Sequence, residues 1–180
     1  MALDIGSKLW VVESLGESRR ISLLGGKLIL QQTRNPGAAF GVATGSTIVF
    51  SVVAVGVIAV IVRTSRKLRS LPWALVLGLL LGGATGNLID RLLRSPGPLR
   101  GHVVDWINFG PDRFPLFNAA DSAIVTGGVV AVYLAMRGLE IDGSRHHAAH
   151  STDPAQQDDA QPDPADLEPS AGDGGSGDRA

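Results

Sequence analysis

Three long apolar runs constrain the fold of this chain more than any other feature of its sequence. Residues 45–62 and 71–89 contain no charged residue, and residues 119–136 contain only Asp121, near their start. About 20 apolar residues in a helix, rising about 1.5 Å each, cross a hydrocarbon core of about 30 Å. Helices of a soluble bundle normally keep a polar stripe, and residues 45–62 have none. The runs therefore predict a mainly α fold, a polytopic membrane helical bundle with three full spans.

The charges divide the chain into two parts of opposite sign. Residues 1–137 contain 14 Lys and Arg against 7 Asp and Glu, whereas residues 138–180 contain 2 against 10. The second part has almost no large apolar residue, so it cannot bury enough surface to offset the entropy of ordering. We therefore expect a membrane-embedded domain at 1–137 and a disordered acidic cytoplasmic tail at 138–180, to which we assign no chemistry. The tail histidines are better explained as a solvated patch than as metal ligands: His146, His147 and His150.

A short basic segment sets the predicted orientation in the membrane. Residues 63–70 contain four cations and no acid, and short loops rich in Lys and Arg face the cytoplasm. Residues 4–44 and 91–118 contain five and four cations, but these segments are much longer and also contain acids. We therefore expect residues 18–44 and 91–118 on the extracytoplasmic side, and residues 137 onward in the cytoplasm.

The start of the chain predicts a short helix. Residues 2–15 have too few consecutive apolar residues to span a bilayer. Asp4 and Lys8 stand four apart, a spacing that pairs side chains on one face of a helix. We expect the remnant of a first span whose beginning is absent.

A small extracytoplasmic β-hairpin is predicted next. Residues 20–24 and 27–33 have the pattern of two short strands, joined by Gly25-Gly26 as a two-residue turn. A hairpin alone is marginal in water, so we expect it to rest on a membrane surface or on neighbouring loops. Residues 102–109 look extended or irregular.

Glycines in the second run predict close helix packing. Gly78, Gly82 and Gly86 repeat every four residues. Such a small-residue face lets another helix approach closely in a membrane. We therefore expect a packed helix there.

Two carboxylates stand beside the apolar runs, Asp105 and Asp121. An acid at the edge of hydrocarbon is costly to keep charged, so it is a functional-site hypothesis by default. Asp121 has a competing explanation, because Asn118 as an N-cap would place it at N3, where an acid meets the helix dipole favourably. Without Asp105 nearby, the two explanations would be equally good.

Other polar residues have simpler local explanations. Asn35 precedes Pro36 and Gly37, where a turn or cap residue is expected. Asp90 and Arg91 close the second run, one turn from Asn87, and suit an interfacial cap and a snorkelling anchor.

Composition excludes several kinds of chemistry. The chain contains no Cys, which rules out disulfides, thiolate nucleophiles and cysteine-based metal sites. His102 lacks companions at the spacing of a metal site, so we interpret it as non-ligating. We expect neither a metal nor a cofactor.

Four ordered motifs identify a family resemblance: NPGAAF at 35–40, GGATGNLIDR at 82–91, HVVDW at 102–106 and FNAADS at 117–122. Together they make residues 4–137 resemble lipoprotein signal peptidase, also called signal peptidase II. The resemblance implies a bacterial aspartyl endopeptidase that removes the signal peptide from lipid-modified prolipoproteins, cutting before the diacylglyceryl-cysteine. It also implies a multi-pass protein of the inner or plasma membrane with its active site on the extracytoplasmic side.

The resemblance also implies roles for individual residues. Asp105 and Asp121 fall on the catalytic pair. Five further residues fall on positions that support the site or contact substrate: Asn35, Gly37, Asn87, Arg91 and Asn118. Asp4 and Lys8, in DIGSK, resemble the Asp and Lys at the end of the family's first helix. The implied partners are diacylglyceryl-modified prolipoprotein signal peptides and membrane lipids, and no nucleic acid.

The chain departs from the family pattern at two places, and two other functions are compatible with its acidic residues. The first helix is nearly all missing, and the segment RSPGPLR at 94–100 is longer than usual. A transporter-like protein could use Asp90, Asp105 and Asp121 as a proton or ion relay, and a membrane scaffold could use the acids as caps. A relay should place polar groups along the spans through the midplane, whereas here they cluster at one end. That clustering favours proteolysis, in which two close carboxyls share one proton and activate a water.

Overall fold

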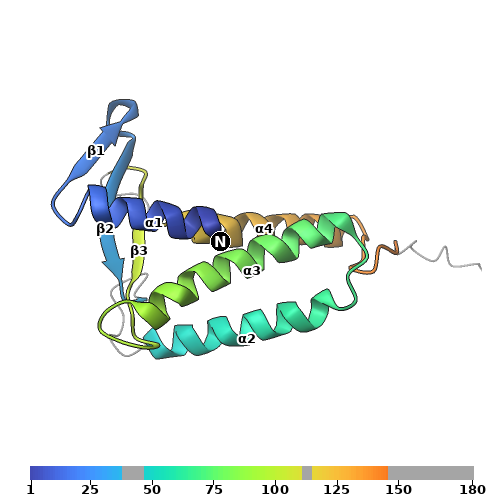
Figure 1. The fold of residues 1–180 in the computed structure, drawn as a ribbon. Helices are drawn as coiled ribbons and strands as arrows, with labels where there is room; N and C mark the ends of the chain where they lie inside the picture. The colour runs from blue at the N-terminus through green and yellow to red at the C-terminus, as the bar shows by residue number, and fades with distance from the viewer. Residues whose placement is uncertain (38–46, 111–114, 146–180) are drawn as a thin grey trace, which may run out of the picture. The chain divides into compact units, whose positions relative to one another are not determined.

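The computed structural model describes residues 1–37, 47–110 and 115–145. In these residues the chain forms four α-helices and one three-stranded antiparallel sheet (Figure 1). The elements in chain order are α1 (Ala2–Ser14), β1 (Arg20–Leu23), the 3₁₀ turn η1 (Leu24–Gly26), β2 (Leu28–Asn35), α2 (Thr47–Ser65), α3 (Leu71–Leu93), β3 (Val103–Asn108) and α4 (Ala119–Met136). The predicted mainly α fold with a small sheet is confirmed.

Three of the helices are long and apolar enough to cross a membrane: α2, α3 and α4. Only 17%, 33% and 17% of their apolar windows are buried inside the protein. Because so many of their apolar side chains point outward, the helices need an apolar environment around them. The chain is a multi-pass membrane protein, and the three predicted spans are confirmed.

Glycines bring α3 close to its neighbours, although not in the predicted pattern. A Cβ on Gly83 would lie 2.5 Å from the carbonyl oxygen of Ala120, so α3 and α4 touch there. Gly86 approaches both Asp4 of α1 and the Cβ of Ala120 in α4, Gly82 approaches the backbone nitrogen of Met1 just before α1, and Gly78 has nothing within 4 Å of a Cβ. The predicted packing on small residues therefore holds at two of the three stripe positions, while the contact at Gly83 was missed.

The hairpin has a longer loop than predicted. Leu23 lies opposite Leu28 in the β1–β2 pairing, so the loop contains four residues, of which Leu24, Gly25 and Gly26 have positive φ. The predicted two-residue turn at Gly25-Gly26 was wrong. Residues 102–109 supply the third strand, because β3 pairs antiparallel with β2. The hairpin therefore gains a neighbouring strand, which is one of the two supports that the sequence predicted.

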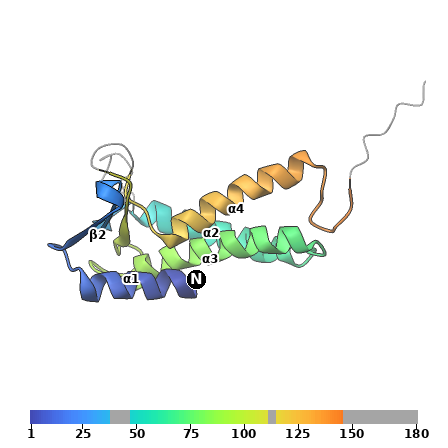
Figure 2. The ribbon, with the colours of Figure 1, turned by 90° about the horizontal axis from the view of Figure 1, so that it is seen from above.

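A small apolar core holds α1 against the sheet. Val11, Leu15 and Val104 are buried together, and Leu30 and Trp106 pack on them. Burial of each such side chain stabilises the fold by about 1.5–3 kcal/mol. The sheet lies across one end of the helical bundle in both views (Figure 1, Figure 2). This core thus fixes α1 and β3 at the end of the membrane spans.

The first residues of the predicted tail fold back on the α2–α3 loop. The carbonyl of Ile141 accepts hydrogen bonds from the backbone N–H groups of Arg69 and Ser70, at 3.1 and 3.2 Å. The indole N–H of Trp73 donates to the carbonyl of Leu139 at 2.8 Å. Residues up to 145 therefore form an ordered turn, and the prediction of disorder beyond them lies outside the described residues.

Candidate active site

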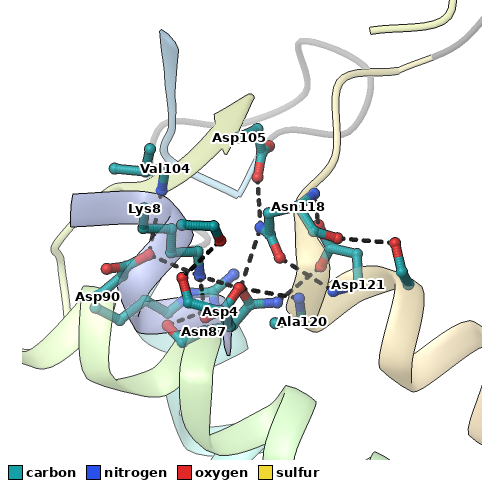
Figure 3. A network of polar contacts seen from close by, with 12 residues as sticks. Asp4, Lys8, Asn87, Asp90, Val104, Asp105, Asn118, Ala120 and Asp121 are labelled. Carbon is teal, nitrogen blue, oxygen red and sulfur yellow. Dashed lines mark hydrogen bonds and ion pairs between the residues drawn. The ribbon is translucent and has the colours of Figure 1, made fainter. Parts of the chain in front are cut away.

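All nine residues that the resemblance singled out belong to one continuous hydrogen-bond network. They come from α1, β2, the segment after it, α3, β3, and α4 with its N-cap. Figure 3 labels members from α1, α3, β3 and the start of α4, which meet where α3 ends and α4 begins. The members are Asp4, Lys8, Asn35, Gly37, Asn87, Arg91, Asp105, Asn118 and Asp121. Residues far apart in sequence thus form a single polar cluster.

Asp105 lies on β3 with 2% of its surface exposed. Its Oδ2 accepts a hydrogen bond from Asn35 Nδ2 at 2.8 Å, and its Oδ1 accepts one from Asn118 Nδ2 at 2.7 Å. Burial, and then the negative charge of Asp121, raise the pKa of Asp105 to about 6, while the two amide hydrogen bonds and the Lys8 charge oppose the shift. Asp105 therefore holds a proton more readily than an ordinary carboxyl.

Asp121 occupies N3 of α4 and completes a capping box. Its Oδ2 accepts from the backbone N–H of Asn118 at 3.1 Å, while its own N–H donates to Asn118 Oδ1 at 3.0 Å. The predicted cap is confirmed. Its Oδ1 also accepts from Asn87 Nδ2 at 2.7 Å, so helix capping does not account for all of its contacts.

Asn118 joins the two acids. Its side-chain oxygen is used by the N-cap, which turns its amide nitrogen toward Asp105 at 2.7 Å and Asn87 at 3.2 Å. The residue is completely buried. A side chain that both caps α4 and donates to Asp105 holds the two carboxyl groups in one arrangement.

Asn35 acts both as a turn residue and as a partner of Asp105. Its Oδ1 accepts from the backbone N–H of Gly37 at 2.8 Å, which leaves its amide nitrogen to face the carboxylate. Gly37 has φ +104°, and a Cβ there would lie 2.7 Å from the ring of Phe50. Only glycine therefore fits this turn without strain.

Arg91 borders a cavity of about 240 Å³ between α2, α3 and α4. Its guanidinium donates to the carbonyl of Asn87 at 3.3 Å, and its Nε is buried with no hydrogen-bond partner among the described residues. The rest of the lining is mostly apolar and includes Phe50, Val53 and Ile124. The guanidinium thus stands at the polar end of an otherwise apolar cavity.

Each acid also borders a cavity of its own. A cavity of about 270 Å³ lies beside Asp105 and is lined by β2 residues, including Arg34 and Asn35. Another of about 250 Å³ lies beside Asp121 and is mostly apolar, with Phe117 and Val125 in its lining. The cavity beside Asp105 thus has a mixed polar and apolar lining, whereas the cavity beside Asp121 is mostly apolar.

Asp90 belongs to the network although the sequence indicated an interfacial cap. It is 3% exposed, pairs with Lys8 Nζ at 2.9 Å and with Arg94, and accepts from the backbone N–H of Val104 at 3.2 Å. The snorkelling interpretation of Arg91 was likewise incomplete, because its Nε is buried. The sequence places Asp90 one helical turn from Asn87, but the partner that brings Asp90 into the network is Lys8, which is distant in the sequence.

No group of three or more His, Asp or Glu in the described ranges is arranged to hold a metal ion. The tail histidines lie outside these ranges. The chemistry of the network must therefore be considered through its carboxyl, amide, ammonium and guanidinium groups.

Comparison with known proteins identifies the family. The family described as "Signal peptidase (SPase) II" matches residues 1–137. A lipoprotein signal peptidase from Streptomyces griseus is 52% identical over 144 residues, which are 80% of this chain and 72% of that protein. One from Mycolicibacterium smegmatis is 44% identical over 163 residues, 89% of this chain and 68% of that protein. A solved bacterial membrane enzyme, 28% identical, superimposes with a TM-score of 0.65 over 76% of this chain and 86% of that one. The chain belongs to the signal peptidase II family of membrane proteases.

Proposed function

We propose that this chain is an aspartyl endopeptidase that removes the signal peptide from lipid-modified prolipoproteins, cutting just before the diacylglyceryl-cysteine. Asp105 and Asp121 are the catalytic pair in this proposal. The observation that carries it is their arrangement: two acids from separate elements share Asn118 and each borders a cavity. Among the described residues, neither acid has a Lys or Arg as a direct hydrogen-bond or ion-pair partner.

The pair performs the cleavage with one shared proton. Two close carboxyls do not both ionise readily, so one is protonated and the other is a carboxylate. The carboxylate takes a proton from a water molecule as the water oxygen attacks the scissile carbonyl carbon. The protonated partner gives its proton to the carbonyl oxygen. Collapse of the tetrahedral intermediate breaks the C–N bond: one hydroxyl of the intermediate returns its proton to the pair as the carboxylic acid forms, and the pair gives a proton to the leaving nitrogen. The pair therefore ends with the one proton with which it began. The proton belongs to the pair and not to one residue.

The neighbouring residues orient the pair and receive the substrate. Asn35, Asn87 and Asn118 each donate an amide hydrogen bond to one carboxylate, with the opposite end of each amide already occupied. Arg91 has an unused Nε donor beside the lateral cavity. We assign it to a backbone carbonyl of the bound signal peptide, whose apolar side chains would enter that cavity from the bilayer.

The same proposal places the chain in a bacterial plasma membrane with the site on the extracytoplasmic side. The four cations of the 63–70 segment lie at the end of α2 away from the site, as the positive-inside rule requires. Cysteines introduced at Ser65 and Ser95 of this cysteine-free chain should be labelled from opposite sides of the membrane. Labelling of both from outside would contradict the orientation.

The arrangement disfavours a proton or ion relay. Every charged residue within α2, α3 and α4 lies near a helix end: Arg63, Asp90, Arg91 and Asp121. The central turns of these helices are apolar or small. A relay across the membrane needs polar groups through the midplane, so we retain proteolysis as the function.

The test uses the purified full chain in lipid. It is incubated with a prolipoprotein that carries the diacylglyceryl group on its cysteine and, separately, with the same precursor left unmodified. Mass spectrometry of the products should show a single cut before the modified cysteine and little cleavage of the unmodified precursor. Equal cleavage of both precursors, or a cut elsewhere, would contradict the proposed specificity.

A further inference from the structure

A lysine is buried beside the proposed catalytic pair without touching either acid through a direct hydrogen bond. Lys8 Nζ lies 2.8 Å from Asp4 Oδ2, 2.9 Å from Asp90 Oδ2 and 3.0 Å from Asn87 Oδ1. Its side chain is 1% exposed. The contact with Asn87 is a hydrogen bond, and the contacts with Asp4 and Asp90 are ion pairs at donor-to-acceptor distance. We call Asp4, Lys8 and Asp90 the buried ion triad.

Each acid of the triad also holds a backbone N–H next to a catalytic aspartate. Asp4 Oδ1 accepts from the N–H of Ala120, at 2.9 Å, and Ala120 immediately precedes Asp121. Asp90 Oδ2 accepts from the N–H of Val104, at 3.2 Å, and Val104 immediately precedes Asp105. Lys8 lies between the two acids (Figure 3). The triad therefore connects the backbone of β3 at Asp105 with the backbone of α4 at Asp121.

We propose that the buried ion triad positions the catalytic pair, by fixing the separation of the two backbone segments that carry Asp105 and Asp121. This inference rests on the proposed function. Lys8 has a second effect through Asn87: because a lysine only donates, it holds Asn87 Oδ1 and turns Nδ2 toward Asp121, 2.7 Å away. Lys8, Asp4 and Asp90 are thus positioning residues and not catalytic residues.

Stability alone does not explain the triad. Buried ion pairs are often no more stabilising than apolar residues of similar volume, because desolvation offsets their attraction. Asp90 already pairs with Arg94, so Lys8 is not required to neutralise it. The glycine at position 86 lets the Asp4 carboxylate lie directly against α3, since a Cβ on Gly86 would lie 2.5 Å from Asp4 Oδ2. The structure brings three charges together at the place where the two catalytic segments approach each other.

Both test variants remove the ammonium group of Lys8. Lys8→Met alone leaves Asp4 buried without its cation, which can prevent folding. The second variant, Lys8→Met with Asp4→Asn, removes that charge as well, while the amide oxygen at position 4 still accepts from Ala120 N. The matched control is Glu17→Gln, which removes an exposed ion pair with Arg34 of β2.

The measurement is kcat and KM per folded molecule, with the folded fraction taken from near-UV circular dichroism. Loss of the buried ion triad should lower kcat on the order of 100-fold, which is the cost of misplacing reacting groups by about 1 Å. KM should stay within about twofold of wild type. The control variant should match wild type in both constants. The inference is overturned if kcat per folded molecule stays at the wild-type level in the double variant, including the case where activity falls only with the folded fraction. It is equally overturned if the double variant does not fold, because the triad would then be a structural requirement.

Asp105→Asn and Asp121→Asn are measured in parallel. If these two variants are inactive and the triad variants are not, the positioning role fails and the proposed function stands. If either aspartate variant cleaves normally, the proposed mechanism itself fails.

Discussion

The raised pKa of Asp105 gives a sign-specific prediction for stability. The carboxyl moves from an ordinary pKa of 3.8 in the unfolded chain to about 6 in the folded protein, chiefly through burial. Between these values the folded state binds a proton that the unfolded state does not, so the free energy of unfolding falls as the pH rises through this range. A shift of this size corresponds to about 3 kcal/mol. At pH 4 the unfolded carboxyl is already more than half ionised, so part of this loss has occurred by then. From this one group, wild-type protein should therefore be less stable at pH 7 than at pH 4 by about 2 kcal/mol.

Asp105→Asn removes the titrating group and with it this loss. The amide also changes the hydrogen bonds with Asn35 and Asn118, but that effect is the same at both pH values and cancels in the comparison. The assay is denaturant unfolding in detergent at pH 4 and pH 7 for both proteins. Relative to wild type, the variant should gain about 2 kcal/mol of unfolding free energy between pH 4 and pH 7.

Asp142→Asn provides a control of opposite sign. Hydrogen bonds from Ser144 lower the pKa of Asp142, an exposed acid in the turn after α4. The Asp142 carboxylate stabilises the folded state above its unfolded pKa, and this stabilisation is lost as the pH falls. Asp142→Asn should therefore lower the free energy of unfolding at pH 7 and not at acidic pH. If Asp105→Asn shifts the stability equally at both pH values, the burial argument for Asp105 is refuted.

Further changes test the local contacts. Asn118→Ala should lower the unfolding free energy by about 2–4 kcal/mol, from a lost N-cap and a lost charged hydrogen bond, and should abolish cleavage. Ser122→Ala, which loses one hydrogen bond to the carbonyl of Asn118, should retain cleavage. If the two variants changed stability and cleavage equally, Asn118 would not be the residue that joins the two acids. Gly37→Ala, at φ +104° with Phe50 in the way, should lower the unfolding free energy by about 1–3 kcal/mol, and an unchanged melting temperature would show that the turn relaxes. Truncation after Arg145 should leave cleavage within about twofold, whereas truncation after Gly138 should lower the melting temperature by removing the contacts of Leu139 and Ile141; identical melting temperatures would show that the turn contributes nothing.

The sequence predicted the membrane spans well, because a continuous apolar run needs no knowledge of tertiary contacts. The end of α3 was less predictable. The second run was expected to end at residue 89 with an interfacial cap, yet α3 continues to Leu93. Asp90 stays inside the protein because Lys8 and Arg94 pair with it, and Lys8 lies far away in the sequence. Local pattern cannot reveal such a partner.

The candidate site was predicted from motifs and not from spacing. Spacing alone favoured a turn for Asn35 and allowed a cap for Asp121, and both local roles are present. Each side chain, however, has a second polar group that contacts a residue distant in sequence. The amide nitrogen of Asn35 donates to Asp105, and Oδ1 of Asp121 accepts from Asn87. A local explanation of an Asn or Asp therefore does not exclude a role in a site.

The hairpin loop shows a different limit. Gly25-Gly26 is a strong signal for a two-residue turn, but β2 is held in register by β3 on its other side. The pairing of Leu23 with Leu28 then leaves four residues in the loop. Tertiary pairing overrode the local turn preference, and a single sequence does not contain that information.

The most direct test of the central claim is the activity of the catalytic-pair variants. Asp105→Asn and Asp121→Asn keep most of the shape of each side chain but cannot accept the proton from water. Each should enter the membrane and fold, yet show no cleavage of the lipid-modified precursor, and the double variant should be scarcely worse than either one, as for residues that act as a unit. Asp142→Asn, at the other end of the bundle, should cleave normally. Wild-type cleavage by both Asp105→Asn and Asp121→Asn would show that this protein is not an aspartyl protease.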